Sequence, residues 1–142
     1  MAAFNKVNLT VEDFLKGVMN LSTDTVKAML TNTAPVATNH VYGDISGSEL
    51  ASGNGYTTGG TAVTGTGLSN SSGTESFASN ATVWTSVTGS MGPFRYVVYY
   101  DNTPATKTIL GWYDYGSSIT LNGANGDTFT VTPSGNVLFT LA

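Results

Sequence analysis

The stretch PFRYVVYYDNTPATKTILGWYDYGSSITL, residues 93–121, decides the fold of this chain. Its first half alternates two sets of side chains with the period of two that defines a β-strand. One set is Phe94, Tyr96, Val98 and Tyr100, and the other is Arg95, Val97, Tyr99 and Asp101. Both sets are largely apolar or aromatic, so we expect this strand to be covered on both faces.

The second half of the stretch returns along the first. Residues 101–104, Asp-Asn-Thr-Pro, have the composition of a turn, because short polar side chains bond their own backbone and proline fixes φ. Strand composition resumes from Thr108 to Tyr115. The pattern predicts a long antiparallel hairpin at the centre of a sheet, followed by a turn at Gly116 into a third strand over 119–121. Within the hairpin, Arg95 and Asp114 are a candidate cross-strand pair.

Composition supports a mainly β fold. Charged residues make up 10% of the 142 residues, against about 25% in an average soluble domain. Threonine, serine, asparagine and 17 glycines replace them, and these residue types favour strands and turns over long helices. We therefore predict a single domain over 1–142, an antiparallel β-sandwich or jelly-roll-like fold with one short N-terminal α-helix.

Several classes of partner are disfavoured by the same composition. The five basic residues form no cluster that could neutralise a phosphate backbone, so we expect no direct nucleic-acid binding. No apolar run approaches the roughly 20 residues of a membrane span, and the N-terminus lacks a hydrophobic signal core. The chain has no cysteine, which is consistent with synthesis in a reducing cytosol.

The N-terminal region is expected to hold an arm and the helix. Residues 1–9 are either a flexible arm or a first strand, and the helix is predicted over about 10–20 with Thr10 as its N-cap. The predicted apolar stripe of this helix is Val11, Phe14, Leu15 and Val18. We expect its Phe14 and Leu15 face to pack on the core.

Further strands follow from short alternating runs between turns. A half-buried strand is predicted over 25–31. Other strands are expected over 74–77, 81–87, 128–132 and 136–141. Residues 69–73 are predicted to be a polar turn, and 133–135 is expected to join the last two strands as a tight hairpin. The glycine-rich stretch 53–60 does not open a helix, so we interpret it as a structural loop anchored by Tyr56, without a nucleotide.

No catalytic, metal or cofactor site is predicted. His40 is the only histidine and no nucleophile motif accompanies it, so we interpret it as a surface or loop residue. Asp101 and Asp127 lie at turns, where aspartate is expected for backbone reasons. Asp114 is predicted to bond Arg95 or a nearby turn.

The aromatic residues are the stronger functional candidates, because they exceed what one face of a small sheet must bury. Each either fills the core or faces outward as a protein-interface anchor or a stacking platform for sugar. The candidate interface residues are Phe4, Val7, Tyr56, Trp84, Tyr99, Trp112 and Tyr113.

Several segments together resemble a family of small structural proteins of tailed bacteriophages. They are FNKVNLTVEDFLKGVMNLSTDTVKAMLTNTAPVATN at the start, NGYTTGGTAV in the middle, and GPFRYVVYYDNTPATKTILGWYDYGSSITL, GDTFTV and VLFTLA toward the end. The resemblance implies a non-enzymatic virion component made in the host bacterial cytoplasm. It implies a capsid decoration or cement protein, with a β-sandwich or jelly-roll fold and often a trimeric assembly, that binds the major capsid protein.

Two other hypotheses stay open at this point. The protein could instead belong to the tail, the baseplate or the base of a fibre. A carbohydrate-binding β-sandwich module is the alternative from a different class, with Trp84, Trp112 or Tyr113 as the stacking platforms. An enzyme is the least favoured hypothesis.

Overall fold

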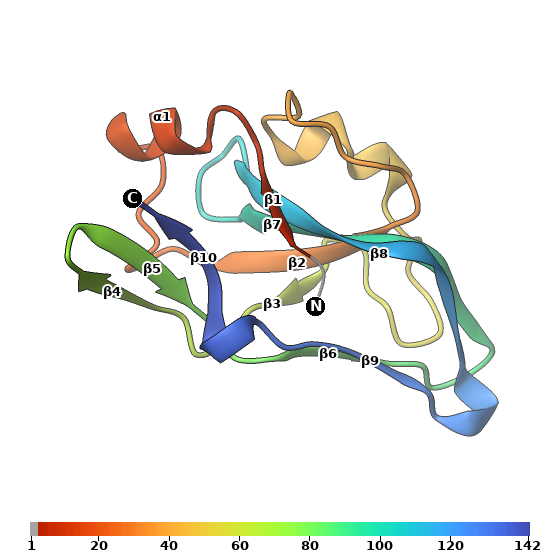
Figure 1. Ribbon diagram of the computed structural model, residues 1–142. Helices are drawn as coiled ribbons and strands as arrows, with labels where there is room; N and C mark the ends of the chain where they lie inside the picture. The colour runs from red at the N-terminus through yellow and green to blue at the C-terminus, as the bar shows by residue number, and fades with distance from the viewer. Residues whose placement is uncertain (1–2) are drawn as a thin grey trace.

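The computed structural model describes residues 3–142 and has a mainly β, sandwich-like fold (Figure 1). Its larger layer is a five-stranded antiparallel sheet with the strand order β1-β8-β7-β2-β3. These strands are β1 (Phe4–Lys6), β2 (Val26–Thr31), β3 (Thr61–Ala62), β7 (Ser90–Asp101) and β8 (Ile109–Asn122). The predicted long hairpin, β7–β8, is confirmed near the centre of this sheet.

Two smaller antiparallel sheets form the second layer. One has the order β10-β5-β4 and the other pairs β6 with β9. Their bounds are β4 (Gly67–Ser71), β5 (Thr74–Ala78), β6 (Thr82–Thr85), β9 (Thr128–Val131) and β10 (Val137–Leu141). In Figure 1, β6 and β9 lie below the large sheet and β4, β5 and β10 lie to its left, and the long hairpin β7–β8 curves down toward β6 and β9 at one end.

The main core lies between the two layers. Val97 and Tyr99 of β7 belong to one buried cluster with Phe77 of β5, Trp84 of β6 and Leu138 of β10. Rings from both layers meet there at short range. The centroids of Trp84 and Phe129, for example, are 5.8 Å apart.

The opposite face of the large sheet is covered by the chain itself, through the irregular segment 41–48 together with Val7. This segment carries the short 3-10 helices η1 (Tyr42–Asp44) and η2 (Ser46–Ser48). Ile45 and Tyr42 pack there on Met29, Val98 and Tyr100. The predicted two-sided burial of the hairpin is confirmed, and within the described residues the second face is covered by an irregular segment and not by another sheet.

One prediction about β2 and one about β7 need correction. The strand over 25–31 is not half-buried: within β2 only Lys27 is partly exposed, because both faces are covered. The alternation predicted for β7 also fails at Arg95. Phe94 pairs with Ile119 whereas Tyr96 pairs with Asp114, so the register shifts and Phe94 joins the face of Val97.

The predicted turn at Gly116 is wrong. β8 continues through this residue to Asn122, and Gly116 adopts a φ of +82° within the strand. Phe94 pairs with Ile119 and Tyr96 with Asp114, so β8 has more residues than β7 between these two pairs. The extra residues of β8 are left unpaired. The feature interpreted as a turn is therefore a bulge that bends one long strand.

Pairing between distant strands was also mispredicted. Residues 69–73 are not a turn, because β4 extends to Ser71 and only 72–73 reverse the chain. β9 and β10 are not a hairpin: β9 pairs with β6 and β10 pairs with β5. Between them η4 (Ser134–Asn136) carries the chain from one small sheet to the other, and η3 (Gly123–Asn125) lies in the β8–β9 connection.

Candidate protein-interaction surface

The N-terminal helix is shorter than predicted and is attached to the sheet by its first residue. α1 spans Thr10–Leu15. Of the segment 1–9, predicted as an arm or a first strand, Phe4–Lys6 forms β1 and pairs with β8, and residues 1–2 lie outside the described residues. Thr10 is not the N-cap, a position that Leu9 takes. The buried Thr10 hydroxyl instead donates to the carbonyl oxygens of Val7, at 3.1 Å, and Leu110, at 3.0 Å. This side chain fixes the start of α1 on β8.

Much of the apolar stripe predicted for this helix faces outward. Leu15 is 85% exposed, Val11 40% and Val18 37%. Phe14 does pack on the main core, so the prediction for the Phe14 and Leu15 face is correct for Phe14 and wrong for Leu15. We call Val11 and Leu15 of α1, together with Val18 just after the helix, the α1 stripe. Exposed apolar residues are a mark of an interaction surface when they cluster.

Two further exposed apolar side chains lie near the start of the helix. Leu9 is 38% exposed and directly precedes α1, and Val36 is 53% exposed. The Asn8 amide donates to the Ala37 carbonyl at 2.8 Å. This bond brings the 36–37 segment beside the entry to α1, so Val36 extends the apolar surface of this end of the molecule.

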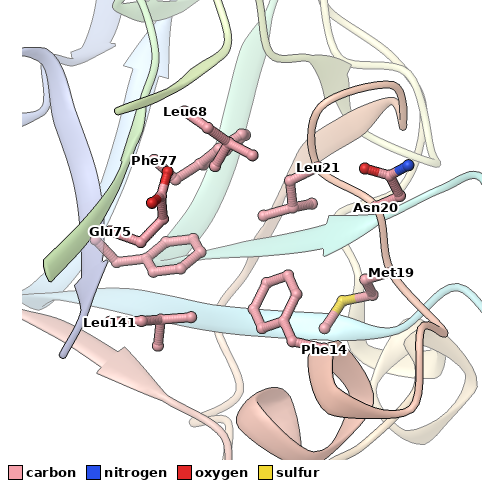
Figure 2. A pocket seen from close by; sticks show the side chains of 9 residues that line it. Phe14, Met19, Asn20, Leu21, Leu68, Glu75, Phe77 and Leu141 are labelled. Carbon is pink, nitrogen blue, oxygen red and sulfur yellow. The ribbon is translucent and has the colours of Figure 1, made fainter. Parts of the chain in front are cut away.

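A pocket of about 270 Å³ opens on the other side of the helix, between α1 and the β10-β5-β4 sheet (Figure 2). Its apolar lining comes from Phe14, Met19, Leu21, Leu68, Phe77, Phe139 and Leu141. Glu75 and Asn20 are its polar members, and Oε2 of Glu75 accepts a hydrogen bond from Nδ2 of Asn70 at 3.0 Å. Leu68, on the fully exposed strand β4, is 46% exposed.

The residues predicted as interface anchors lie elsewhere. Val7, Tyr56, Trp84, Tyr99 and Tyr113 are each at most 3% exposed. A partner cannot reach them in the folded chain, so the core alternative holds for these five. Trp84 and Tyr113 accordingly present no open ring face on which a sugar could stack.

The remaining two predicted anchors, Phe4 and Trp112, are partly buried. The Phe4 ring packs on Phe139, with 5.4 Å between centroids, and on Tyr113, with 5.2 Å. Trp112 packs against the second cluster.

The sequence periodicity of α1 identified the residues of the stripe but could not show which way the helix faces.

The ionisable side chains form structural pairs. His40 lies in a loop, as predicted, with Nε2 2.7 Å from Oδ2 of the buried Asp13. Asp44 accepts the backbone amides of Val41 and His40, and these bonds lower the pKa of its carboxyl. The nearby Asp44 thus binds backbone and does not orient the imidazole.

The predicted pair of Arg95 and Asp114 is confirmed. Nε of Arg95 lies 2.7 Å from Oδ1 of Asp114, and the second nitrogen, Nη2, lies 2.8 Å from Oδ2. Asp114 also accepts the amide of Gly116 at 2.7 Å. The Arg95 contact, then the Gly116 amide, lower the pKa of Asp114. Asp114 therefore binds the predicted arginine and also the Gly116 amide, which belongs to the bulge in β8 and not to a turn.

Sequence reasoning missed a second polar cluster, around Glu49. Its carboxylate accepts hydrogen bonds from the hydroxyls of Tyr42 and Tyr56 and from the amide of Gly59, at 2.8 Å. Tyr56 in turn accepts the amide of Leu30 at 3.0 Å. Burial, and then the contact with Glu49, raise the pKa of both phenols. The cluster fastens the 42–60 segment to β2, and it confirms Tyr56 as the anchor of the glycine-rich loop.

Across residues 3–142, no group of three or more His, Asp or Glu side chains is arranged to hold a metal ion. No helix in the same range has the length and apolar character needed to cross a bilayer. Comparison of the chain with protein-family models, with curated proteins and with solved structures finds no match.

Proposed function

We propose that this chain is a non-enzymatic structural protein of a tailed-phage virion, a capsid decoration or cement protein that binds the major capsid protein and stabilises the shell. The observation that carries the proposal is the α1 stripe, in which Leu15 is 85% exposed on a helix whose Phe14 lines an apolar pocket. The assignment to a virion, and to its capsid, rests on the sequence resemblance to structural proteins of tailed bacteriophages. The stripe supplies the surface through which such a protein would bind.

The energetics of the stripe suit a component that binds in many copies. Fully burying one exposed aliphatic side chain contributes on the order of 1.5–3 kcal/mol. Three such side chains give a modest contact in one copy. Repetition over a symmetric shell, or assembly of the protein itself into a homo-oligomer such as a trimer, would turn modest contacts into stable attachment.

The test is thermal melting of capsids with and without the protein. We expect the wild-type protein to bind the shells and raise their melting temperature, and Leu15→Asp to lose both effects because it places a charge in the interface. Val87→Asp is the matched control, since Val87 is also exposed, at 63%, but follows β6 in the second layer.

Two results would contradict the proposal. One is capsid melting that the wild-type protein does not change. The other is equal binding by wild type and Leu15→Asp, which would place the contact away from the stripe.

A further inference from the structure

Asp101, the last residue of β7, is a fully buried carboxyl: its exposed fraction is 0%. It lies opposite Val26 of β2, which belongs to the main core. Across from β2, the Asp101 amide donates to the Thr108 carbonyl at 2.8 Å, so Asp101 and Thr108 are directly opposite each other. Their side chains therefore lie on the same face of the sheet. Carboxyl groups are almost never fully buried without a partner, so this position requires an explanation.

The hydrogen bonds of Asp101 account for only one of its oxygens. Oδ1 accepts the amide of Thr103 at 2.9 Å. Oδ2 is buried and no N–H or O–H group within residues 3–142 donates to it, and the buried hydroxyl of Thr108 has no hydrogen-bond partner either. An ionised carboxylate in this position would leave a charged oxygen unsolvated, which is strongly unfavourable.

The neighbouring ionisable group is another acid. Burial raises the pKa of Asp101 to about 6, the Thr103 amide opposes this rise, and hydrogen bonding and charge from Asp24 add to it. Basic groups of the adjoining elements point elsewhere. Lys27 is opposite Tyr100 and therefore on the other face of the sheet, and Nζ of Lys107 lies 5.2 Å from the centre of the Tyr42 ring.

The remaining charged groups nearby already have partners. His40 lies on the segment that pairs with Thr108, through Val41, and it directs its imidazole to Asp13 of α1. No cation among these groups offsets the charge of the two carboxyls.

The two acids belong to two loops that are fastened together. Thr25 donates its amide to the Thr103 hydroxyl at 2.8 Å, and Asn102 donates its amide to the Thr25 carbonyl at 2.8 Å. The Asn20 amide donates to Oδ2 of Asp24 at 2.6 Å. The 20–25 loop is also the connection from α1 to β2, so its attachment to the 101–108 loop fixes the exit from the helix.

We propose that Asp24 and Asp101 share one proton and form a pH-sensitive latch between the 20–25 and 101–108 loops. In the latched form the protonated Oδ2 of Asp101 donates to the Asp24 carboxylate. When the pH rises, this proton passes to water and leaves two carboxylates facing each other, one of them without solvent. The repulsion then loosens the 20–25 loop from the end of the sheet.

The direction of the effect on stability follows from the raised pKa. The folded chain holds the proton of Asp101 more tightly than the unfolded chain does. The stabilisation is therefore complete below the ordinary carboxyl pKa and is lost as the pH rises through about 6.

The experiment compares the Tm of wild type and Asp101→Asn from about pH 5 to about pH 7.5. The asparagine amide can donate to Asp24 without carrying a charge, so we expect the wild-type Tm to fall by at least about 3 °C relative to the variant across this range. The ionisable groups other than residue 101 are common to both proteins, so their contributions cancel from the difference. Glu12→Gln, which removes an exposed carboxylate, should follow the wild-type curve.

Two further measurements complete the test. If Asp101→Asn does not fold, Asp24→Asn replaces it, and its Tm should depend less on pH than that of wild type. Exchange of the Asn102 amide in wild type should rise above its intrinsic pH dependence on passing pH about 6.

Parallel Tm curves for wild type and the folded variants would overturn the latch. So would a calcium-induced rise in the Tm of wild type that Asp101→Asn abolishes, because the two carboxyls would then hold a cation and not a shared proton.

Discussion

Gly60 and Gly126 have nearly the same backbone conformation, with φ of +69° and +65°, but very different surroundings. A Cβ added at Gly60 would lie 2.3 Å from the Ala28 carbonyl oxygen of β2, whereas a Cβ at Gly126 would have nothing within 4 Å. Gly60 therefore serves two purposes, a left-handed turn and the close approach of the glycine-rich loop to the sheet. Gly126 serves only the first.

This difference gives a matched pair of substitutions. Gly126→Ala should cost about 1–2 kcal/mol of unfolding free energy, the penalty of placing a side chain in a left-handed conformation. Gly60→Ala should cost at least about 3 kcal/mol, because it adds a backbone clash to the same penalty. Urea denaturation measures both, and equal losses would show that the loop can move away from β2 without cost.

Single residues differ in how far the sequence reveals their partners. The pair of Arg95 and Asp114 could be predicted, because both lie on the two strands of one hairpin and opposite charges on neighbouring strands attract. Glu49 could not, since its three donors come together only when the irregular 42–60 segment folds onto β2. No periodic pattern marks such a segment in advance.

At the scale of the element, α1 depends on one hydroxyl. The helix has only six residues, too few to be stable by itself, and the Thr10 hydroxyl links it to Val7 and Leu110. Thr10→Val keeps the shape and removes both hydrogen bonds, so it should cost about 1–3 kcal/mol and speed hydrogen exchange over 10–16.

The conservative variant Thr10→Ser is the control for this prediction. It retains the hydroxyl and should therefore keep the slow exchange of the helix. If Thr10→Ser and Thr10→Val exchange equally fast, packing of the threonine methyl holds the helix and not the hydrogen bonds.

The strands themselves were easier to predict than their pairing. Alternation located β2, β5, β6, β9 and β10 to within a few residues, because it reflects burial of each strand's own faces. The partner of a strand depends on residues far away in the chain. The Pro133–Gly135 turn therefore suggested a β9–β10 hairpin, although the two strands belong to different sheets.

At the scale of the whole molecule, two hydrophobic clusters share one sheet. The main core lies on one face of β2 and β7 and the second cluster on the other, so loss of the sheet removes both. The chain has two tryptophans, with Trp84 in the first cluster and Trp112 against the second. Each cluster therefore has its own fluorescent reporter.

We expect the two clusters to unfold together. In urea, the single-tryptophan variants Trp112→Phe and Trp84→Phe should each show one unfolding transition. The midpoint of this transition measured by fluorescence should equal the midpoint measured by far-UV circular dichroism. Fluorescence that changes before the circular dichroism in either variant would show that its cluster opens while the rest of the sheet persists.

Composition was sufficient to predict a mainly β molecule, but not its exposed surface. The excess of aromatic residues suggested an interface, because one buried face of a small sheet cannot absorb them. The structure buries most of them in two clusters instead, one on each face. The large apolar side chains that stay exposed are aliphatic, and Leu15, exposed at 85%, lies on α1, where helical periodicity alone predicted a core contact.

Because the chain covers both faces of β2 and β7 with its own segments, we expect these strands to tolerate few substitutions. Almost every substitution in them would have to be matched by a change in the layer that the substituted side chain faces. The outward residues of α1 and the exposed strand β4 carry no such constraint. A lineage of such proteins could therefore change its binding partner by altering these surfaces while inheriting the interior unchanged.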